Sequence, residues 1–176
     1  MVTPNKKMIK VARALITLCK ARKLKLAMAE SCTGGLLAAT LTEIPGCSAV
    51  VDRGFVTYTN ESKQQMLGVP ARTLEKYGAV SRETAEAMAK GALAHSAADI
   101  TVAVTGIAGP GGGSKQKPVG LVHFSAAARN GTRLHHVGRF GDIGRGKVRQ
   151  KSVMQALAML HDIAAKKVTR AIAKKK

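Results

Sequence analysis

Hydrophobic and polar positions along this 176-residue chain follow two kinds of pattern. Apolar residues spaced three and four apart predict amphipathic helices, whereas short apolar runs rich in β-branched residues predict buried strands. The first pattern predicts helices over 5–22, 36–43, 60–68, 81–95 and 143–170. The second predicts strands over 24–29, 49–58, 100–104, 119–126 and 132–140, with Asn130-Gly131 as a hairpin turn between the last two.

Helices that alternate with central strands, together with one hairpin, predict the α/β class. We expect a three-layer α/β/α sandwich around a mixed, mainly parallel sheet. No internal repeat is visible, and the length fits a single domain over 1–176 with a basic tail from about residue 166. Because hydrophobic residues make up 45% of the chain and aromatic residues only 3%, the core must be mainly aliphatic.

The formal charge of +19 is concentrated at the two ends of the chain. Residues 1–25 hold eight Lys or Arg and no acid, and residues 144–176 hold ten together with one acid, Asp162. The ends therefore carry 17 of the 19 charges, either as solvated faces of terminal helices or as an attractor of polyanions or of a phosphorylated substrate. No zinc-finger or RNP-like pattern supports sequence-specific recognition of nucleic acid, so we favour a small-molecule partner.

Targeting and cysteine patterns point to an intracellular setting. No apolar run approaches the ~18 residues of a membrane span, and Arg13 and Lys20 interrupt any signal-like segment. We therefore expect a cytoplasmic protein without a membrane partner. The three cysteines are odd in number and lack CxxC spacing, which argues against a disulfide framework or a zinc site. No histidine cluster has ligand spacing, so we expect neither a metal nor another cofactor.

The segment 27–35, AMAESCTGG, carries the most chemistry. It joins a predicted strand to a predicted helix, where unpaired backbone N–H groups and the helix dipole can stabilise a negative charge. A serine in such a turn, Ser31, can attack a carbonyl while nearby N–H groups hold the oxyanion. The competing interpretation is that Ser31 or Thr33 only caps the helix. Cys32 is an alternative nucleophile, although a small packing residue is the simpler interpretation.

Three loops, 30–35, 58–63 and 105–113, each follow the end of a predicted strand. Ligands bind beyond the carboxyl ends of strands in open α/β sheets, so we expect one shared site. With Asn60 as the predicted N-cap, Lys63 would be the third residue of a helix. The helix dipole and burial would both lower its pKa, which suits a general base, whereas the competing interpretation is a surface lysine. Tyr58 could relay a proton, orient a substrate or simply pack.

The glycine-rich loop 106–113 resembles a phosphate-binding segment only in part. It is not a Walker A loop, because Gly113 is followed by Ser114-Lys115 and Pro118 leads into a strand. Successive N–H groups, including those of Gly106, Gly109 and Gly113, could still form an anion-binding nest. The competing interpretation is a flexible linker.

Five segments resemble, in this order, the CinA C-terminal domain family: AESCTGGLLAATLTEIPGCS, VTYTNESKQQMLGV, YGAVSRETAEAMAKGAL, AVTGIAGPGGGSKQKPVGLV and FGDIGRGKVR. The resemblance covers about residues 8–165, and this family includes stand-alone nicotinamide-nucleotide amidohydrolases. It implies an α/β/α domain, often a homodimer, that converts nicotinamide mononucleotide to nicotinate mononucleotide and ammonia in pyridine nucleotide salvage. We expect no additional N-terminal domain in this chain.

By the same resemblance, the family's catalytic serine, lysine and tyrosine fall on Ser31, Lys63 and Tyr58. The threonine of its TGIAGP loop falls on Thr105, and an arginine of a later segment is best matched by Arg145. The sequence departs from the family pattern there, since residues 140–145 read FGDIGR.

These observations lead to one hypothesis and one rival. We expect a Ser-Lys amidohydrolase in which neutral Lys63, helped by Tyr58, accepts the Ser31 proton. The expected substrate-binding residues are Glu30, Thr33, Gly34, Gly35, Asn60, Thr105, Gly106, Gly109, Gly113 and Arg145, with the 33–35 amides holding the oxyanion. The rival is a non-enzymatic, basic protein associated with DNA or RNA and linked to competence, which the charged ends support.

Overall fold

The computed structural model describes residues 3–166. Its strands form one five-stranded sheet in the order β2-β1-β3-β4-β5. The strands are β1 (Leu26–Glu30), β2 (Val51–Val56), β3 (Ile100–Gly106), β4 (Leu121–Ala128) and β5 (Arg133–Arg139). β1 is parallel to β2 and β3, whereas β4 is antiparallel to β3 and β5. Four strands therefore point the same way, which confirms the mixed, mainly parallel sheet and the hairpin at Asn130-Gly131.

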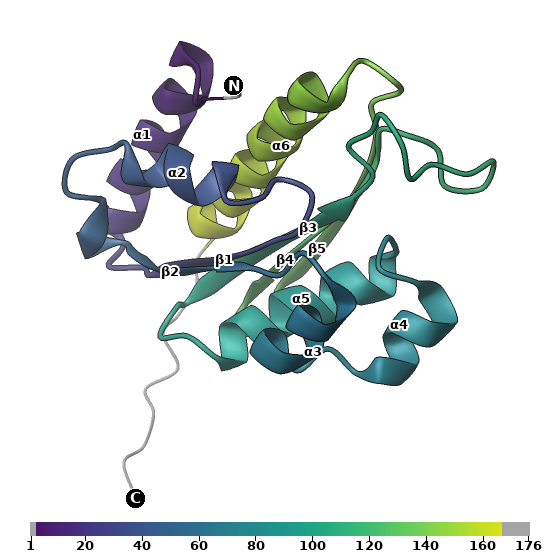
Figure 1. Ribbon diagram of the computed structural model, residues 1–176. Helices are drawn as coiled ribbons and strands as arrows, with labels where there is room; N and C mark the ends of the chain where they lie inside the picture. The colour runs from purple at the N-terminus through teal and green to yellow at the C-terminus, as the bar shows by residue number, and fades with distance from the viewer. Residues whose placement is uncertain (1–2, 167–176) are drawn as a thin grey trace, which may run out of the picture.

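Helices cover both faces of the sheet (Figure 1). On one face lie α1 (Lys6–Ala21), α2 (Leu36–Thr42) and α6 (Arg145–Ala165). On the other lie α3 (Asn60–Leu67), α4 (Ala71–Tyr77) and α5 (Arg82–Ala94). This arrangement confirms the predicted three-layer sandwich. In the described part of the chain, no helix is both long and apolar enough to cross a membrane.

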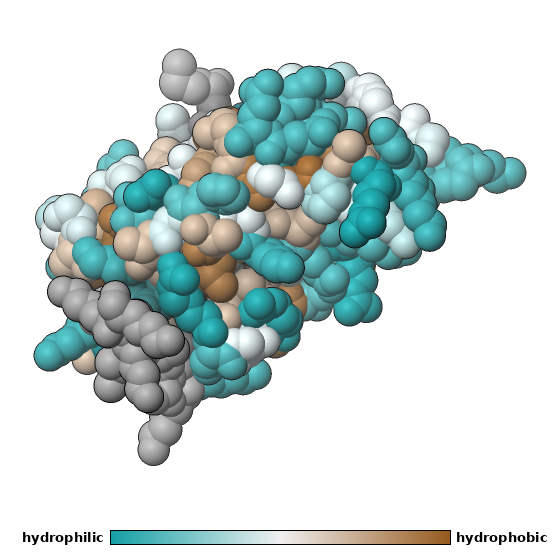
Figure 2. Space-filling model, turned by 90° about the horizontal axis from the view of Figure 1, so that it is seen from below, coloured by the Kyte–Doolittle hydropathy of each residue, from teal (hydrophilic) through white to brown (hydrophobic). Residues whose placement is uncertain are grey.

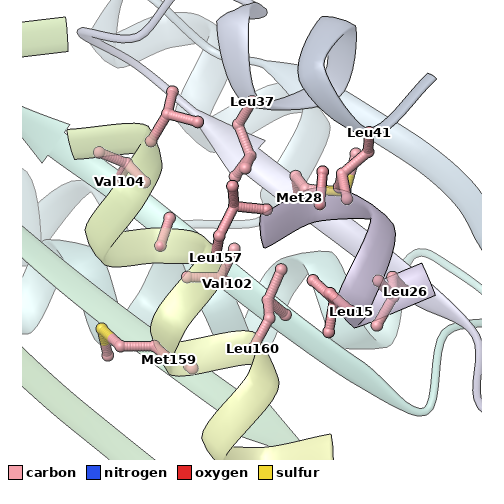
Figure 3. Close-up of a cluster of buried hydrophobic side chains, with 14 of the residues drawn as sticks. Leu15, Leu26, Met28, Leu37, Leu41, Val102, Val104, Leu157, Met159 and Leu160 are labelled. Carbon is pink, nitrogen blue, oxygen red and sulfur yellow. The ribbon is translucent and has the colours of Figure 1, made fainter. Parts of the chain in front are cut away.

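The larger core lies between the sheet and the helices α1, α2 and α6. Leu15 of α1, Leu37 of α2 and Leu157 of α6 meet the side chains of Met28 and Val102 on the sheet (Figure 3). All five are fully buried. Burying each such side chain stabilises the fold by about 1.5–3 kcal/mol, so this aliphatic layer holds the central strands and their ends in place.

The opposite face is more modestly apolar. A smaller cluster packs α3 and α5 on the sheet, with Leu67, Met88 and Ala103 among its members. Seen from this side, the surface is mainly hydrophilic, with short apolar stretches between charged side chains (Figure 2). The buried cluster on the α3 side is therefore smaller than the one on the α6 side.

Several predicted boundaries differ from the structure. The strand predicted over 49–58 is replaced at its start by a short 3-10 helix, Cys47–Ala49, and β2 begins only at Val51. α4 was not predicted from the pattern, because its seven residues bury only Leu74 and show too little periodicity. α6 ends at Ala165, and both the end of the predicted 143–170 helix and the basic tail fall, from 167 onward, outside the described residues.

We predict that Gly91→Ala destabilises the protein. A Cβ at this position of α5 would overlap the carbonyl oxygen of Leu67 at the end of α3. Alanine favours a helix by about 1 kcal/mol over glycine, but forcing α3 away should cost about 1–3 kcal/mol or more. Chemical denaturation measures the difference. Gly111→Ala is the control, because its Cβ would meet nothing within 4 Å; equal stability of the two variants would contradict the prediction.

Candidate active site

The carboxyl ends of three parallel strands meet at one edge of the sheet. Glu30, the last residue of β1, lies beside Val56 of β2 and Val104 of β3. Ser31 follows directly, and its N–H donates to the Val104 carbonyl at 2.9 Å. The backbone N–H of Thr57 donates to the Glu30 carbonyl at 2.8 Å. The loops predicted to share a site therefore leave the sheet side by side.

The turn after β1 is held by the carboxylate of Glu30. Glu30 is fully buried, and its two oxygens accept hydrogen bonds from the N–H groups of Gly35, Leu37 and Ala38 at 2.8–3.1 Å. Gly34 and Gly35 have φ values of +57° and +88°, which glycine adopts at little cost. Glu30 thus supports the turn from beneath, with three backbone N–H groups bound to its two oxygens.

Neither Ser31 nor Thr33 caps α2. The N-cap residue is Gly35, which makes no side-chain capping bond. The capping interpretation of Ser31 is therefore wrong, because the Glu30 carboxylate already occupies the first amides of the helix. Ser31 remains 8% exposed, and its hydroxyl faces Lys63.

Lys63 reaches Ser31 from the start of α3. The predicted N-cap at Asn60 is wrong by one residue: Thr59 is the cap, and its side chain accepts from the N–H of Ser62. Lys63 is therefore the fourth helical residue. Because side chains in a helix point back toward its N-terminus, Lys63 folds over the preceding loop. Asn60 itself is exposed.

The Lys63 side chain is fully buried, and oxygen atoms surround its nitrogen. Its Nζ is 3.3 Å from Ser31 Oγ and 2.9, 3.2 and 3.3 Å from the carbonyls of Thr57, Tyr58 and Thr59. No carboxylate lies within ion-pair distance of it among residues 3–166. The surface-lysine interpretation is therefore wrong, and the expected burial of Lys63 beside Ser31 is confirmed.

Burial lowers the pKa of Lys63 below its ordinary value of 10.5, while the nearby Cys32 and Glu61 side chains oppose the shift. A neutral amine has two N–H donors and one lone pair. Two of the three carbonyls can accept hydrogen bonds from these N–H groups. The lone pair is then left to accept the hydrogen bond of the Ser31 hydroxyl. The three carbonyls also suit the three donors of the ammonium form, so these oxygen atoms accommodate both protonation states.

Cys32 is a packing residue. It is 5% exposed, and burial raises the pKa of its thiol to about 12, with Arg145 and Arg149 among the charges that oppose this. A thiol with such a pKa is protonated at neutral pH and a poor nucleophile. Ser31 is therefore the better candidate.

The amides of the turn differ in availability. The N–H of Gly34 donates to the Ser31 carbonyl at 3.0 Å, and that of Gly35 donates to Glu30. In contrast, the N–H groups of Cys32 and Thr33 donate to no backbone or side-chain oxygen within the described chain. The buried hydroxyls of Thr33 and Thr57 also have no partner among the described residues. The free donors thus lie closer to Ser31 than the sequence predicted.

Tyr58 and Arg145 form the outer part of the site. Tyr58 is 58% exposed, and its hydroxyl accepts from Nη2 of Arg145 at 3.2 Å. The phenol therefore contacts Arg145 rather than Lys63, which Tyr58 reaches only through its carbonyl. Arg145, the first residue of α6, also donates to the Gly109 carbonyl at 3.1 Å. This one guanidinium joins two of the three loops predicted to share the site, 58–63 and 105–113.

The glycine-rich loop is anchored at its start and near its middle. The Thr105 hydroxyl donates to the Ala79 carbonyl at 2.7 Å and so ties the end of β3 to the segment before α5. Gly106 ends β3, and Gly109 is held by Arg145, whereas Gly113 is exposed in the projecting part of the loop. Thr105 thus has a structural bond already, and the exposed amides are the part of the loop open to a ligand.

Arg149 is a site residue that the sequence reasoning missed. Its Nη2 and Nε donate to the Thr33 carbonyl at 2.7 and 3.2 Å. The signal was its spacing: Arg145 and Arg149 are four residues apart and share one side of a helix. Among residues 3–166, no group of three or more His, Cys, Asp or Glu could hold a metal ion.

Comparison with known proteins places this chain and its fold in a family. Residues 8–164 match the CinA C-terminal domain. The chain belongs to the CinA C-terminal domain family. A CinA-like protein of Parasynechococcus marenigrum is 48% identical over 151 residues, which are 85% of this chain and 36% of that protein. This CinA domain spans about a third of the length of the curated relatives that it matches.

Solved structures share the whole fold of this CinA domain. The crystal structure of the competence/damage inducible protein CihA from Agrobacterium tumefaciens has a TM-score of 0.90 at 57% identity, covering 93% of this chain and 98% of that one. A CinA superfamily protein from Klebsiella pneumoniae has a TM-score of 0.85 at 35% identity, covering 90% and 98%.

Two hollows lie near this CinA site without including Ser31. One, of about 320 Å³, lies between α3, α4 and α5 and is lined by Leu67 and Lys90, at the opposite end of α3 from Lys63. The other, of about 350 Å³, is lined by Val119, Arg139 and Asp142 beside the glycine-rich loop. The chemistry at Ser31 and these two hollows are therefore separate features.

We predict that Glu30→Ala destabilises this CinA domain by at least about 2 kcal/mol, because one buried and two part-buried amides lose a charged acceptor. Glu30→Gln, which keeps one acceptor oxygen, should fall between this variant and the wild type. Thermal unfolding of both variants measures the effect. A Glu30→Ala protein within about 0.5 kcal/mol of wild type would mean that the carboxylate does not hold the turn.

Proposed function

We propose that this CinA domain hydrolyses the carboxamide of nicotinamide mononucleotide to nicotinate mononucleotide and ammonia, with Ser31 as nucleophile and Lys63 as general base. One observation carries the proposal: a fully buried lysine, without an acidic partner in the described chain, has its Nζ 3.3 Å from Ser31 Oγ. The solved relatives are named for competence and damage, so the proposal rests on the site and on the family resemblance of its residues.

The reaction proceeds through an acyl-enzyme. The Ser31 hydroxyl passes its proton to neutral Lys63 as Oγ bonds to the carboxamide carbon. The C–N bond then breaks, and the leaving nitrogen takes the proton from Lys63 and departs as ammonia. Water attacks the ester carbon and gives a proton to Lys63, which returns it to Ser31 Oγ as the carboxylic acid product leaves and ionises.

The tetrahedral intermediate needs donors for its oxyanion. The free amides of Cys32 and Thr33 support this role, because those of Gly34 and Gly35 are already used within the turn. Such preorganised donors typically contribute 10²–10³-fold each to kcat. The oxyanion site is therefore proposed one to two residues earlier than the sequence suggested.

The phosphate and ribose would lie outside the reacting amide. Arg145 has no acidic partner among the described residues and stands between Tyr58 and the glycine-rich loop. A guanidinium bound only to neutral oxygens suits a phosphate ligand. Tyr58 then positions the substrate through Arg145 rather than relaying the Ser31 proton.

A nucleic-acid-binding role is the alternative. α1 exposes Lys6, Lys10, Arg13 and Lys20 along one side, and neither ion pair of the described chain involves them. A variant in which three of these four residues are replaced by glutamate distinguishes the two functions. Loss of nucleic-acid binding with unchanged ammonia release would support both the amidase and this secondary role, whereas absence of ammonia release from the wild type would favour the alternative.

We predict that Ser31→Ala abolishes ammonia release from nicotinamide mononucleotide while leaving the fold intact. Removing a nucleophile costs orders of magnitude in kcat, and the Ser31 side chain caps nothing. Cys32→Ser, in the next position, is the matched control and should retain most activity. Near-wild-type turnover by Ser31→Ala would remove the serine from the mechanism.

We predict that the rate rises with pH through the lowered pKa of Lys63, since only the neutral amine accepts a proton. Lys63→Arg should reduce kcat by at least about 10²-fold, because a guanidinium stays protonated. The pH dependence of kcat/KM for the wild type gives the apparent pKa. A flat profile from pH 6 to 10, or an active Lys63→Arg variant, would exclude lysine as the base.

We predict that the phosphate of the substrate is recognised by Arg145. Nicotinamide riboside lacks this phosphate, and its kcat/KM should be about 10–100-fold lower than that of the mononucleotide. This is the contribution expected from hydrogen bonds to one charged group. Arg145→Gln should lower kcat/KM for the mononucleotide and change it little for the riboside. Equal losses on both substrates would place the phosphate elsewhere.

A further inference from the structure

Arg149 contacts the turn that carries the nucleophile. It lies one helical turn after Arg145 in α6 and is half-buried. Two of its nitrogens converge on the carbonyl oxygen of Thr33, at 2.7 and 3.2 Å. The described chain offers it no acidic partner. The positive charge of Arg149 is therefore directed at one peptide group.

A chain of hydrogen bonds leads from that peptide back to the nucleophile. The Thr33 carbonyl belongs to the same peptide unit as the N–H of Gly34, which donates to the Ser31 carbonyl at 3.0 Å. The Ser31 carbonyl in turn belongs to the same unit as the N–H of Cys32. That last N–H donates to no oxygen in the described chain. Two hydrogen-bonded peptide units thus connect a cation to the amide of the residue that follows Ser31.

We infer that Arg149 is a positioning residue, which fixes this turn and polarises its peptide units so that the Cys32 amide becomes a stronger oxyanion donor. The inference rests on the proposed function, because it concerns acylation at Ser31. Arg149 is not proposed to touch the substrate.

The physical basis is cooperative polarisation. A cation at a carbonyl oxygen makes the N–H of the same peptide more acidic, and successive hydrogen bonds strengthen one another by roughly 10–30% each. This polarisation stabilises the complex most when negative charge develops next to the last donor, the Cys32 N–H. That charge develops only in the transition state. Interactions of that kind raise kcat rather than lower KM.

The two arginines should therefore have different kinetic effects. Arg145 faces the Tyr58 hydroxyl and the glycine-rich loop, so its loss should raise KM. Arg149 faces the backbone of the turn, so its loss should lower kcat. We expect a 10–100-fold decrease for Arg149→Gln, below the 10²–10³-fold cost of removing an oxyanion donor outright.

The experiment compares Arg149→Gln and Arg149→Lys with Lys147→Gln, which removes one exposed charge from the same helix without contacting the turn. We expect kcat to fall with KM within about threefold of wild type for Arg149→Gln, partial retention for Arg149→Lys and no change for Lys147→Gln. Millimolar methylguanidinium should restore part of the activity of Arg149→Ala. A raised KM at unchanged kcat, or no change, would overturn the inference.

A second measurement separates this inference from the proposed function. A small fluorophosphonate labels an activated serine and needs the oxyanion donors but not the nucleotide site. Its rate of reaction with Ser31, followed by mass spectrometry, should fall in Arg149→Gln and not in Lys147→Gln, with Ser31→Ala as the blank. Wild-type labelling without hydrolysis of nicotinamide mononucleotide would reject only the substrate. Equal labelling of the wild type and Arg149→Gln would reject the role of Arg149.

Discussion

The site depends on one buried interaction, between the Glu30 carboxylate and the first amides of α2. A carboxylate with no exposed surface is costly unless its oxygens are satisfied, and here three backbone N–H groups satisfy them. The bond fixes where α2 begins relative to β1. Because the helix start is already occupied, the Ser31 hydroxyl does not cap it and is free to face Lys63.

Lys63 complements this arrangement from the other side of the edge. Burying an ammonium group without an acid disfavours the charged form. The three carbonyls of residues 57–59 accept its hydrogen bonds and so offset part of the cost of burying it. A general base must be neutral when it accepts the proton and must then be stable enough in its protonated form to carry it. A salt bridge would have stabilised the cation and held the proton on the lysine, so the absence of an acidic partner in the described chain is consistent with the proposed chemistry.

The basic residues of α6 are not confined to an outer helix surface. α1 and α6 pack side by side on the same face of the sheet, so the first and last helices of the described chain, both of which carry basic residues, are neighbours (Figure 1). The start of α6 also reaches the carboxyl edge, where Arg145 and Arg149 contact the glycine-rich loop and the Ser31 turn. The sequence had assigned this charge to the terminal elements and away from the motifs, whereas part of it belongs to the site.

The sequence alone determined the layers, the sheet type and the edge at which the loops converge, because these follow from local periodicity and from the position of turns after strands. It also predicted Ser31, Lys63 and Arg145 as site residues, since their types and motifs are readable without coordinates. Only the tertiary structure decided that Glu30 supports the turn, that Tyr58 pairs with Arg145 and that Arg149 binds Thr33. Those contacts join residues of separate elements, up to 116 positions apart, and no local pattern specifies which carbonyl or carboxylate a side chain will meet once the helices have packed on the sheet.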